Sequence, residues 1–338
     1  MPLTLVSAWS QFLVCAALIA VAGSYLSRYG DVIAEKTGLS GTWIGLVLLA
    51  SVTSLPELIT GISAVTLAKS PNIALGDALG SCVFNLVIIT MLDFLHRGEP
   101  LYSRASQGHI LSAGFGVILI GFVGFSLLVG PRGNAALGHV GLYSPVIVAL
   151  YAVAMFTVFR YERAQQATFV EQRVERYPDV SLRQAVRRYA AWAVVGVVAG
   201  AWLPFVGEAL AEAMGWHRTF VGTLFVAFAT SVPEIVVTLA AFRIGAIDMA
   251  IGNLFGSNLF DIFIVAVDDL FFLDGPLLSH VSPLHAVTAL SATMMSGIAI
   301  VGLLYRPRTR LFGTVGWASL FLLVVYLFNS LVLYLYGE

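Results

Sequence analysis

Residues 50–57 of this 338-residue chain have the sequence ASVTSLPE, and residues 76–85 have the sequence GDALGSCVFN. A near-copy follows in the second half, where residues 227–234 are AFATSVPE and residues 252–261 are GNLFGSNLFD. The offset between the copies is 177 positions for the first motif and 176 for the second. Each copy places a Thr-Ser pair, a Pro-Glu pair and a final acid or amide in apolar surroundings. This repetition predicts a duplicated polar site built from two related halves.

The composition indicates where that site lies. Hydrophobic residues make up 59% of the chain and charged residues only 11%, whereas a soluble domain carries about 25% charged residues. We therefore expect the lipid bilayer to be a partner, and the first apolar run to be a retained membrane helix. Cys15 and Cys82 both lie in apolar runs, so no disulfide is expected. No basic tract or zinc-finger spacing suggests nucleic acid, and no cofactor is expected.

Ten segments are long enough to cross a membrane, which requires about 20 apolar residues. They cover residues 6–28, 41–68, 71–95, 107–130, 139–160, 186–213, 218–242, 246–272, 283–305 and 311–336. We predict an all-α polytopic membrane protein whose ten helices form two inverted five-helix repeats.

The long hydrophilic stretch 161–185 separates the two predicted repeats. Residues 1–160 form the first repeat, with its repeated motif (α-repeat 1) at about 41–95. Residues 186–338 form the second, with α-repeat 2 at about 218–272. The division makes 161–185 a linker.

Basic residues predict the orientation. If the N-terminus is outside, all of the 18 lysines and arginines except Lys69, Arg132 and Arg218 lie on one side of the membrane. Because basic residues concentrate on the cytoplasmic side, we expect a cytoplasmic linker, external termini and a location in the cell (inner) membrane. An odd number of helices per repeat inverts the second repeat, an architecture in which secondary transporters bind ions near the midplane.

Helical spacing brings oxygen atoms together. Pro56 and Pro233 interrupt their segments, and residues four apart, such as Thr53 and Glu57, share a helix face. The gathered groups are the carboxylates of Glu57, Glu234 and Asp261, the amide of Asn85, and the hydroxyls of Thr53, Ser54, Ser81, Thr230, Ser231 and Ser257. Such hard oxygen ligands suit Na⁺, Ca²⁺ or Mg²⁺. Membrane acids without a basic partner indicate an ion pathway.

The motifs TSLPE (53–57) and GSCVFN (80–85), with TSVPE (230–234) and GSNLFD (256–261), resemble the two α-repeats of the cation/Ca²⁺ exchanger superfamily. The resemblance is strongest to its prokaryotic sodium/calcium exchanger branch. It implies four central ion sites, with Glu57 and Glu234 as central acids completed by Asn85 and Asp261. It also implies supporting hydroxyls from the six residues above and backbone carbonyl ligands from Ala50 and Ala227. Segments 6–28 and 186–213 resemble the paired gating helices of that family.

Four further acids depart from the family pattern. Asp77 stands where the family has asparagine, and it can add charge near the site. Asp93, Asp268 and Asp269 end the third and eighth segments, and Asp93 aligns with Asp269. We expect these three at the membrane interface.

The predicted function is antiport of Na⁺ and Ca²⁺ by alternating access, and no enzymatic activity is expected. Three site acids balance about three Na⁺ but one Ca²⁺ balances two, so we expect about three Na⁺ per Ca²⁺ and electrogenic exchange. The main alternative is a proton/Ca²⁺ (or other divalent cation) exchanger of the same fold. An ion channel and an intramembrane aspartyl protease are further alternatives. The protease is disfavoured because residues 74–77 (ALGD) lack its first glycine and its partner acid motif is missing. No HExxH or P-loop motif occurs, which disfavours a metalloprotease and an ATP-driven pump.

Overall fold

The computed structural model describes residues 5–36, 53–96, 101–130, 135–166, 177, 179–243, 245, 247–306, 311 and 315–337. The helices of the first half are α1 (Leu5–Lys36), α3 (Leu55–Thr66), α4 (Pro71–Leu95), α5 (Leu101–Arg104), α6 (His109–Val129) and α7 (Tyr143–Gln166). A short antiparallel hairpin of β1 (Ala136–Leu137) and β2 (Val140–Gly141) precedes α7.

The second half follows the same plan. Its elements are α8 (Leu182–Met214), α9 (Arg218–Val221), the π-helical turn η1 (Gly222–Val226), α10 (Ala227–Thr230), α11 (Val232–Arg243), α12 (Ile247–Phe271), the 3₁₀ turn η2 (Leu277–Ser279), α13 (His285–Tyr305) and α14 (Trp317–Tyr336). Within the described residues, 8 helices can span a membrane, and the bent α9–α10/α11 pair makes a ninth. The predicted span 41–68 begins outside the described residues and continues as α3. The prediction of an all-α polytopic membrane protein is confirmed.

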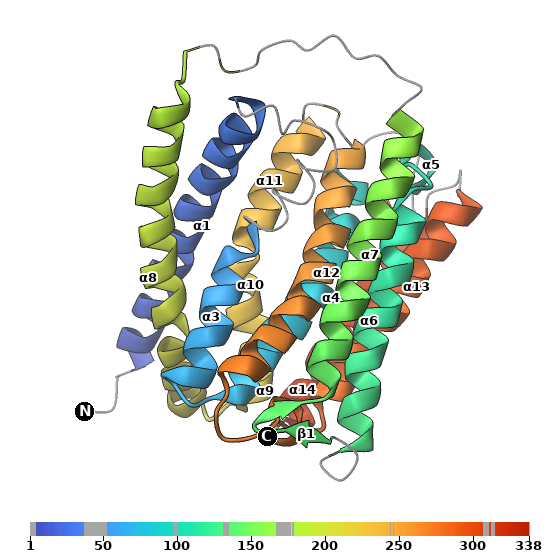
Figure 1. Cartoon of the computed structure of the whole chain (residues 1–338). Coiled ribbons are helices and arrows are strands. Elements are labelled where there is room, and N and C mark those ends of the chain that lie inside the picture. Colours follow the sequence, from blue (N-terminus) through green and yellow to red (C-terminus); the bar gives the residue numbers. More distant parts are fainter. Residues whose placement is uncertain are drawn as a thin grey trace.

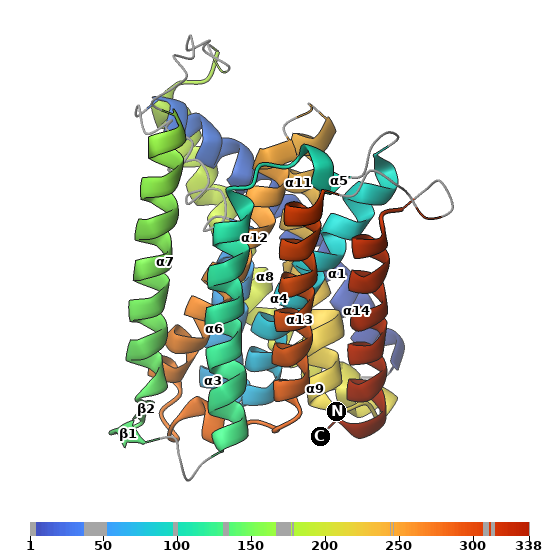
Figure 2. The same cartoon turned by 90° about the vertical axis from the view of Figure 1, so that its right-hand side faces the viewer.

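The two halves run in opposite directions. α1 and α8 pack side by side and antiparallel along one edge of the bundle (Figure 1). α6, α7, α13 and α14 cover another face (Figure 2). We call the end where α1 begins and α14 ends the terminal end, and the end where α7 ends and α8 begins the linker end. Because corresponding helices have reversed directions, the predicted inverted repeat is confirmed.

Two helices form the centre of the bundle. In the most apolar window of α12, 83% of the residues are buried, and in that of α4 the share is 72%. The corresponding share is 28% for α1, α7 and α14. A helix that is apolar all round must be enclosed by protein or lipid. The motif-bearing helices α4 and α12 are therefore enclosed by protein, and the outer helices present apolar side chains to lipid.

Both proline-containing segments break at the Thr-Ser pair. α10 ends at Thr230, α11 begins at Val232, and the two parts of the segment are bent by 45°. In the first repeat, Ser54 precedes α3, whose first turn contains Pro56. Proline fits the first turn of a helix because its missing N–H would have no partner there. Each break therefore places a Pro-Glu pair at the start of a half-helix.

Glycines let α1 and α8 approach these breaks. Gly23 of α1 lies against the ring of Pro233, and Gly200 of α8 lies against Ile59 and the carbonyl of Pro56. The offset of 177 that relates Pro56 to Pro233 also relates Gly23 to Gly200. Each repeat thus packs an edge helix on the broken helix of the other repeat through an equivalent glycine.

We expect Gly23→Ala to destabilise the protein, because the added β-carbon would overlap the rigid Pro233 ring. Overpacking costs about 1–3 kcal/mol, which outweighs the roughly 1 kcal/mol that alanine gains over glycine in helix propensity. The thermal unfolding midpoint in detergent should fall. Gly114→Ala is the matched control, since a β-carbon on that α6 glycine meets nothing within 4 Å. Equal midpoints for the two variants would contradict the close contact.

Asp93 and Asp269 close the ends of the repeats. Each carboxylate accepts N–H groups from a residue eight positions later and from a glycine, and an O–H from a serine three positions after that glycine. The donors are Leu101, Gly316 and Ser319 for Asp93, and Leu277, Gly141 and Ser144 for Asp269. Both side chains are fully buried by protein. Burial by protein does not fix depth in the membrane, so their expected placement at the membrane interface stays a prediction. Hydrogen bonds to the carboxylate offset its burial, and the two acids serve as equivalent internal anchors.

Candidate cation-binding site

Glu57 and Glu234 meet across the interface between the repeats. Each lies in the first turn of its half-helix, where the helix dipole favours negative charge, and each is only 1% exposed. The hydroxyl of Ser231 donates to Oε1 of Glu57 at 3.4 Å, and that of Ser54 donates to Oε1 of Glu234 at 3.1 Å. Oε2 of each glutamate has no hydrogen-bond partner among the described residues. The two acids are therefore held reciprocally, each with one oxygen available.

Serines of α4 and α12 complete this layer. Ser231 Oγ lies 3.0 Å from Ser81 Oγ, and the Ser257 hydroxyl donates to Oε1 of Glu234 at 3.4 Å. Each hydroxyl has one proton but two acceptor lone pairs. A cation placed among them can therefore be coordinated by hydroxyl oxygens while the protons point to the carboxylates.

Asn85 and Asp261 face each other between the central helices. Asn85 Nδ2 donates to Asn258 Oδ1 at 3.0 Å and lies 3.5 Å from Asp261 Oδ2. Asp261 Oδ2 also lies 3.9 Å from the sulfur of Cys82. In the part of the chain that the structure describes, Asn85 Oδ1 and Asp261 Oδ1 have no hydrogen-bond partner. This pair therefore supplies two more buried oxygens.

The remaining predicted ligands lie around this centre. Thr53 and Thr230 are fully buried, and Thr230 Oγ1 lies 2.8 Å from Asp77 Oδ1. The carbonyl of Ala227 accepts the backbone N–H of Ser231 at 3.0 Å and lies 3.2 Å from the Thr230 hydroxyl. Ala50 lies outside the described residues.

Sequence reasoning missed one buried polar residue near the site, Asn258, and left the role of another, Asp77, undecided. Asp77 was expected only to add charge, but its 2.8 Å contact with Thr230 brings it next to the predicted ligands. Asn258, which follows Ser257 directly, accepts a hydrogen bond from Asn85 Nδ2 and donates one from its own Nδ2 to the carbonyl of Cys82. Asn258 escaped notice because the equivalent position in the first repeat is Cys82, so the motif comparison carried no signal. Asp268 is buried by protein too, and its expected position at the membrane interface stays a prediction.

The chemistry of these groups suits a hard cation. The ion pairs of the described residues join Lys69 to Asp274, His109 to Asp248 and Arg218 to Glu208, and none involves a site acid. Within the described ranges, no three His, Cys, Asp or Glu side chains converge closely enough to hold a metal ion by themselves. A cation here therefore takes hydroxyl, amide and backbone oxygens besides carboxylates, as Na⁺ and Ca²⁺ do more readily than soft metals.

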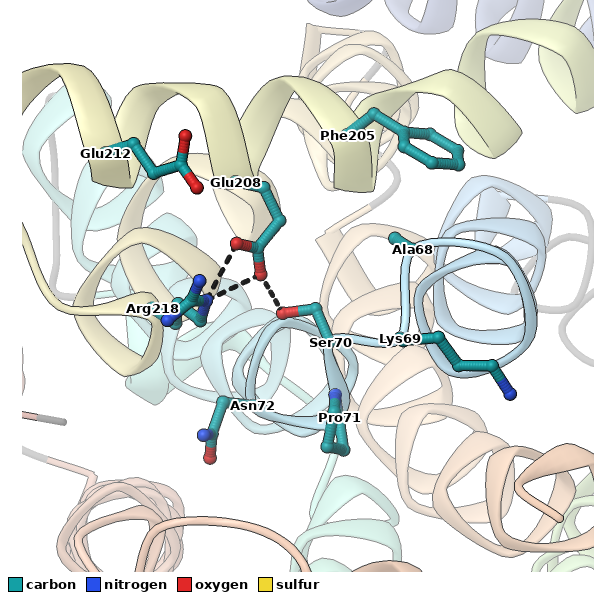
Figure 3. A pocket seen from close by; sticks show the side chains of 9 residues that line it. All are labelled: Ala68, Lys69, Ser70, Pro71, Asn72, Phe205, Glu208, Glu212 and Arg218. Carbon is teal, nitrogen blue, oxygen red and sulfur yellow. Dashed lines mark hydrogen bonds and ion pairs between the residues drawn. The ribbon is translucent and has the colours of Figure 1, made fainter. Parts of the chain in front are cut away.

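A separate pocket of about 480 Å³ opens at the terminal end, between α8 and the turn that precedes α4. Figure 3 shows Glu208 of α8 between Ser70 and Arg218. Arg218 contacts both carboxylate oxygens of Glu208 at 2.7 and 2.8 Å, and Ser70 donates to Oε1. The charge of Glu208 is thus compensated, and the pocket is distinct from the buried cation site.

The sodium/calcium exchanger protein family model matches residues 7–161 and 189–332, which is most of the chain. The uncharacterized membrane protein MJ0091 of Methanocaldococcus jannaschii is 30% identical, with 68% of this chain and 70% of that protein covered. The sodium/calcium exchanger MaX1 of Methanosarcina acetivorans is 27% identical, with 71% and 76% covered.

Two solved structures share the fold. Native YfkE superposes with a TM-score of 0.64 at 19% identity, covering 96% of this chain and 92% of YfkE. The sodium-calcium exchanger NCX_Mj, soaked with 10 mM Na⁺ and no Ca²⁺, gives a TM-score of 0.58 at 20% identity and covers 98% and 100%. The family match spans both repeats and both polar motifs, and its fold is one of transporters: the chain belongs to the sodium/calcium exchanger protein family.

Proposed function

We propose that this protein is a secondary active antiporter that exchanges Na⁺ for Ca²⁺ by alternating access, with about three Na⁺ per Ca²⁺ and net charge movement. One observation carries the proposal. Two equivalent buried glutamates, Glu57 and Glu234, each keep one carboxylate oxygen free of hydrogen bonds, and no basic residue pairs with them among the described residues. Buried acids of this kind are costly unless a cation binds.

In this proposal both ions use the same set of ligands. Glu57 and Glu234 coordinate Ca²⁺ centrally, and Asn85 with Asp261 completes the four ion positions. The supporting oxygens come from the hydroxyls of Thr53, Ser54, Ser81, Thr230, Ser231 and Ser257 and from the carbonyls of Ala50 and Ala227. Because Na⁺ and Ca²⁺ compete for the same carboxylates, the site is occupied by one kind of ion at a time, which is the condition for exchange.

Alternating access requires an edge that moves relative to the site. α1 and α8 pack against each other and across α3 and α11. Pro204 removes the N–H that would bond the carbonyl of Gly200, and Thr60 of α3 donates to that carbonyl at 3.2 Å. Ser63 donates to the next carbonyl, that of Ala201, at 2.6 Å. We infer that α1 and α8 slide as a pair, exchanging these side-chain contacts without breaking helical backbone bonds.

The proposed orientation follows from the basic residues. The linker end, with residues 161–185, faces the cytoplasm, and the terminal end faces outward in the cell (inner) membrane. The functional division remains a first repeat of residues 1–160 and a second of residues 186–338.

Ca²⁺ uptake into proteoliposomes tests the proposed coupling. An outward Na⁺ gradient is expected to drive uptake well above that of protein-free liposomes, and a pH gradient without Na⁺ is not. Monensin, which dissipates the Na⁺ gradient, serves as a control and should abolish the uptake. Uptake driven by a pH gradient alone would instead establish the proton/Ca²⁺ exchanger, the alternative with the same fold.

A further inference from the structure

Asp268 of α12 is an acid that the proposed exchange does not use. Its side chain is only 1% exposed, and neither carboxylate oxygen has a hydrogen-bond partner among the described residues. The adjacent Asp269 differs sharply, because it accepts hydrogen bonds from Gly141, Tyr143 and Ser144 in addition to the Leu277 N–H. Hydrogen-bond donors therefore surround the carboxylate of Asp269, whereas that of Asp268 has none among the described residues.

The carboxylate of Asp268 lies on the terminal side of the cation site. Asp268 follows Asp261 by two helical turns, about 10 Å along the axis at roughly 1.5 Å per residue. It points at Gly61 of α3, one turn beyond Glu57, and a β-carbon on Gly61 would overlap the carboxylate. The missing side chain at Gly61 thus provides the space that Asp268 occupies.

The inverted repeat shows that this acid is specific to one side. The positions equivalent to Asp268 and Gly61 in the other repeats are Leu92 and Thr238. Asn253 is the equivalent of Asp77, and its amide donates to the Thr238 hydroxyl at 3.4 Å. At these equivalent positions the linker side of the site is therefore neutral, whereas the terminal side carries two buried acids, Asp77 and Asp268.

No basic group compensates Asp268 within the described structure. The titratable groups that face it are Asp77 of α4 and Asp269 of its own helix, with Glu57 one turn away on α3. The Tyr143 hydroxyl of α7 is turned to Asp269. The parts of α6, β2 and η2 at this end contain no titratable side chain, and on α11 the ionisable residues are Glu234, in the central site, and Arg243, at the linker end.

The surroundings of Asp268 are poorly suited to binding a metal ion. Na⁺ or Ca²⁺ would need several oxygens around it, but no cluster of three His, Cys, Asp or Glu side chains forms around Asp268 within the described residues. The Thr60 and Ser63 hydroxyls of α3 are directed at carbonyls of α8. An isolated ionised carboxylate in such surroundings is very costly, and the group becomes neutral instead. A proton requires no further ligand.

We propose that Asp268 is a proton-binding site on the terminal side of the cation site. It holds a proton while it is buried and exchanges it with the medium when the terminal-side pathway admits water. The ionised form then adds negative charge to that pathway alone. The inference concerns the resting charge of Asp268 and holds whether the cargo is exchanged for Na⁺ or for protons.

Infrared difference spectroscopy tests the resting charge directly. Purified protein in nanodiscs at neutral pH is compared with Asp268→Asn, which replaces a neutral acid by a neutral amide of similar size. The wild-type-minus-variant spectrum is expected to contain the C=O stretch of one protonated carboxylic acid, shifted in heavy water. Asp274→Asn is the matched control, because Asp274 is exposed and lies 3.7 Å from Lys69; it should lose carboxylate bands instead.

A carboxylate signal in the Asp268→Asn difference spectrum would overturn the proposal. Asp268→Leu, which introduces the residue found at the equivalent position 92, is a second variant. It shows whether an effect is due to loss of the acid or to the asparagine introduced in its place. Both neutral variants are expected to fold with thermal midpoints close to that of the wild type. Failure of both variants to fold would also contradict the proposal. If Asp268 is protonated and uncharged in the folded protein, replacing it by an uncharged side chain removes no charge on which folding depends.

Discussion

Glu57→Gln and Glu234→Gln are each expected to abolish Ca²⁺ exchange in a protein that still folds and inserts. Glutamine keeps the size of the side chain and its acceptor for the Ser231 or Ser54 hydroxyl. It removes one of the two negative charges that we assign to the central Ca²⁺ site. Breaking a buried charge pair costs about 3–5 kcal/mol, and about 1.4 kcal/mol corresponds to a factor of ten in affinity. We therefore expect Ca²⁺ affinity to fall by roughly 100-fold or more.

Ca²⁺ uptake by proteoliposomes and Ca²⁺ binding by calorimetry would measure this loss. Glu212→Gln is a suitable control, because Glu212 is an exposed acid at the terminal end of α8. It should retain the wild-type rate. Because the two glutamates occupy equivalent positions, the two substitutions should have similar effects. Wild-type flux in either variant would remove that glutamate from the proposed ligand set.

The second large effect is expected from Asp261→Asn, which makes the site more symmetric by introducing the amide of its equivalent, Asn85. One Ca²⁺ balances the charges of Glu57 and Glu234, whereas about three Na⁺ use a third negative charge, and an unbalanced buried charge is costly. We expect the variant to keep Ca²⁺ binding and to bind Na⁺ more weakly. Na⁺-driven Ca²⁺ uptake should fall by about tenfold or more, while Ca²⁺/Ca²⁺ exchange continues.

The wild-type protein supplies a second measurement of the same model. If solvent compensates the Asp261 carboxylate while Ca²⁺ is bound, no proton moves with Ca²⁺ and each cycle moves one net charge. The reversal potential then depends on the logarithms of the Na⁺ and Ca²⁺ gradients in a ratio of about three to one. Asp77 does not change this result if its charge is the same with either ion bound. Its 2.8 Å contact with Thr230 makes Asp77→Asn the informative comparison. Exchange unaffected by voltage would contradict the scheme.

Much of the architecture was predictable because it depends on local patterns. A span needs about 20 apolar residues in a row, whatever surrounds it, and nearly all the predicted segments coincide with described helices. The offsets of 177 and 176 positions disclosed the repeat directly. The prolines predicted the breaks in the two motif-bearing segments, because a residue without an N–H interrupts the hydrogen bonding of a helix. The site residues lie near one another as expected, and their role as ligands stays a prediction.

Four acids that depart from the family pattern could not be assigned a role from the sequence. Asp93, Asp268 and Asp269 all end apolar segments, so their sequence surroundings are nearly alike. The structure separates them because Asp93 and Asp269 meet N–H and hydroxyl donors from distant segments, such as Gly316 and Gly141. Asp268 instead meets the bare backbone of Gly61. Asp77 contacts Thr230 from the opposite repeat.

The sequence by itself therefore determined the membrane class, the inverted repeat, the breaks and the candidate ligands, because each follows from periodicity or repetition along one chain. The tertiary structure decided which acids are compensated and which are not. The free energy of a buried carboxylate depends on the donors and charges within a few ångströms of it. In this protein several of those neighbours lie more than 100 positions away along the chain, where no local pattern can indicate them.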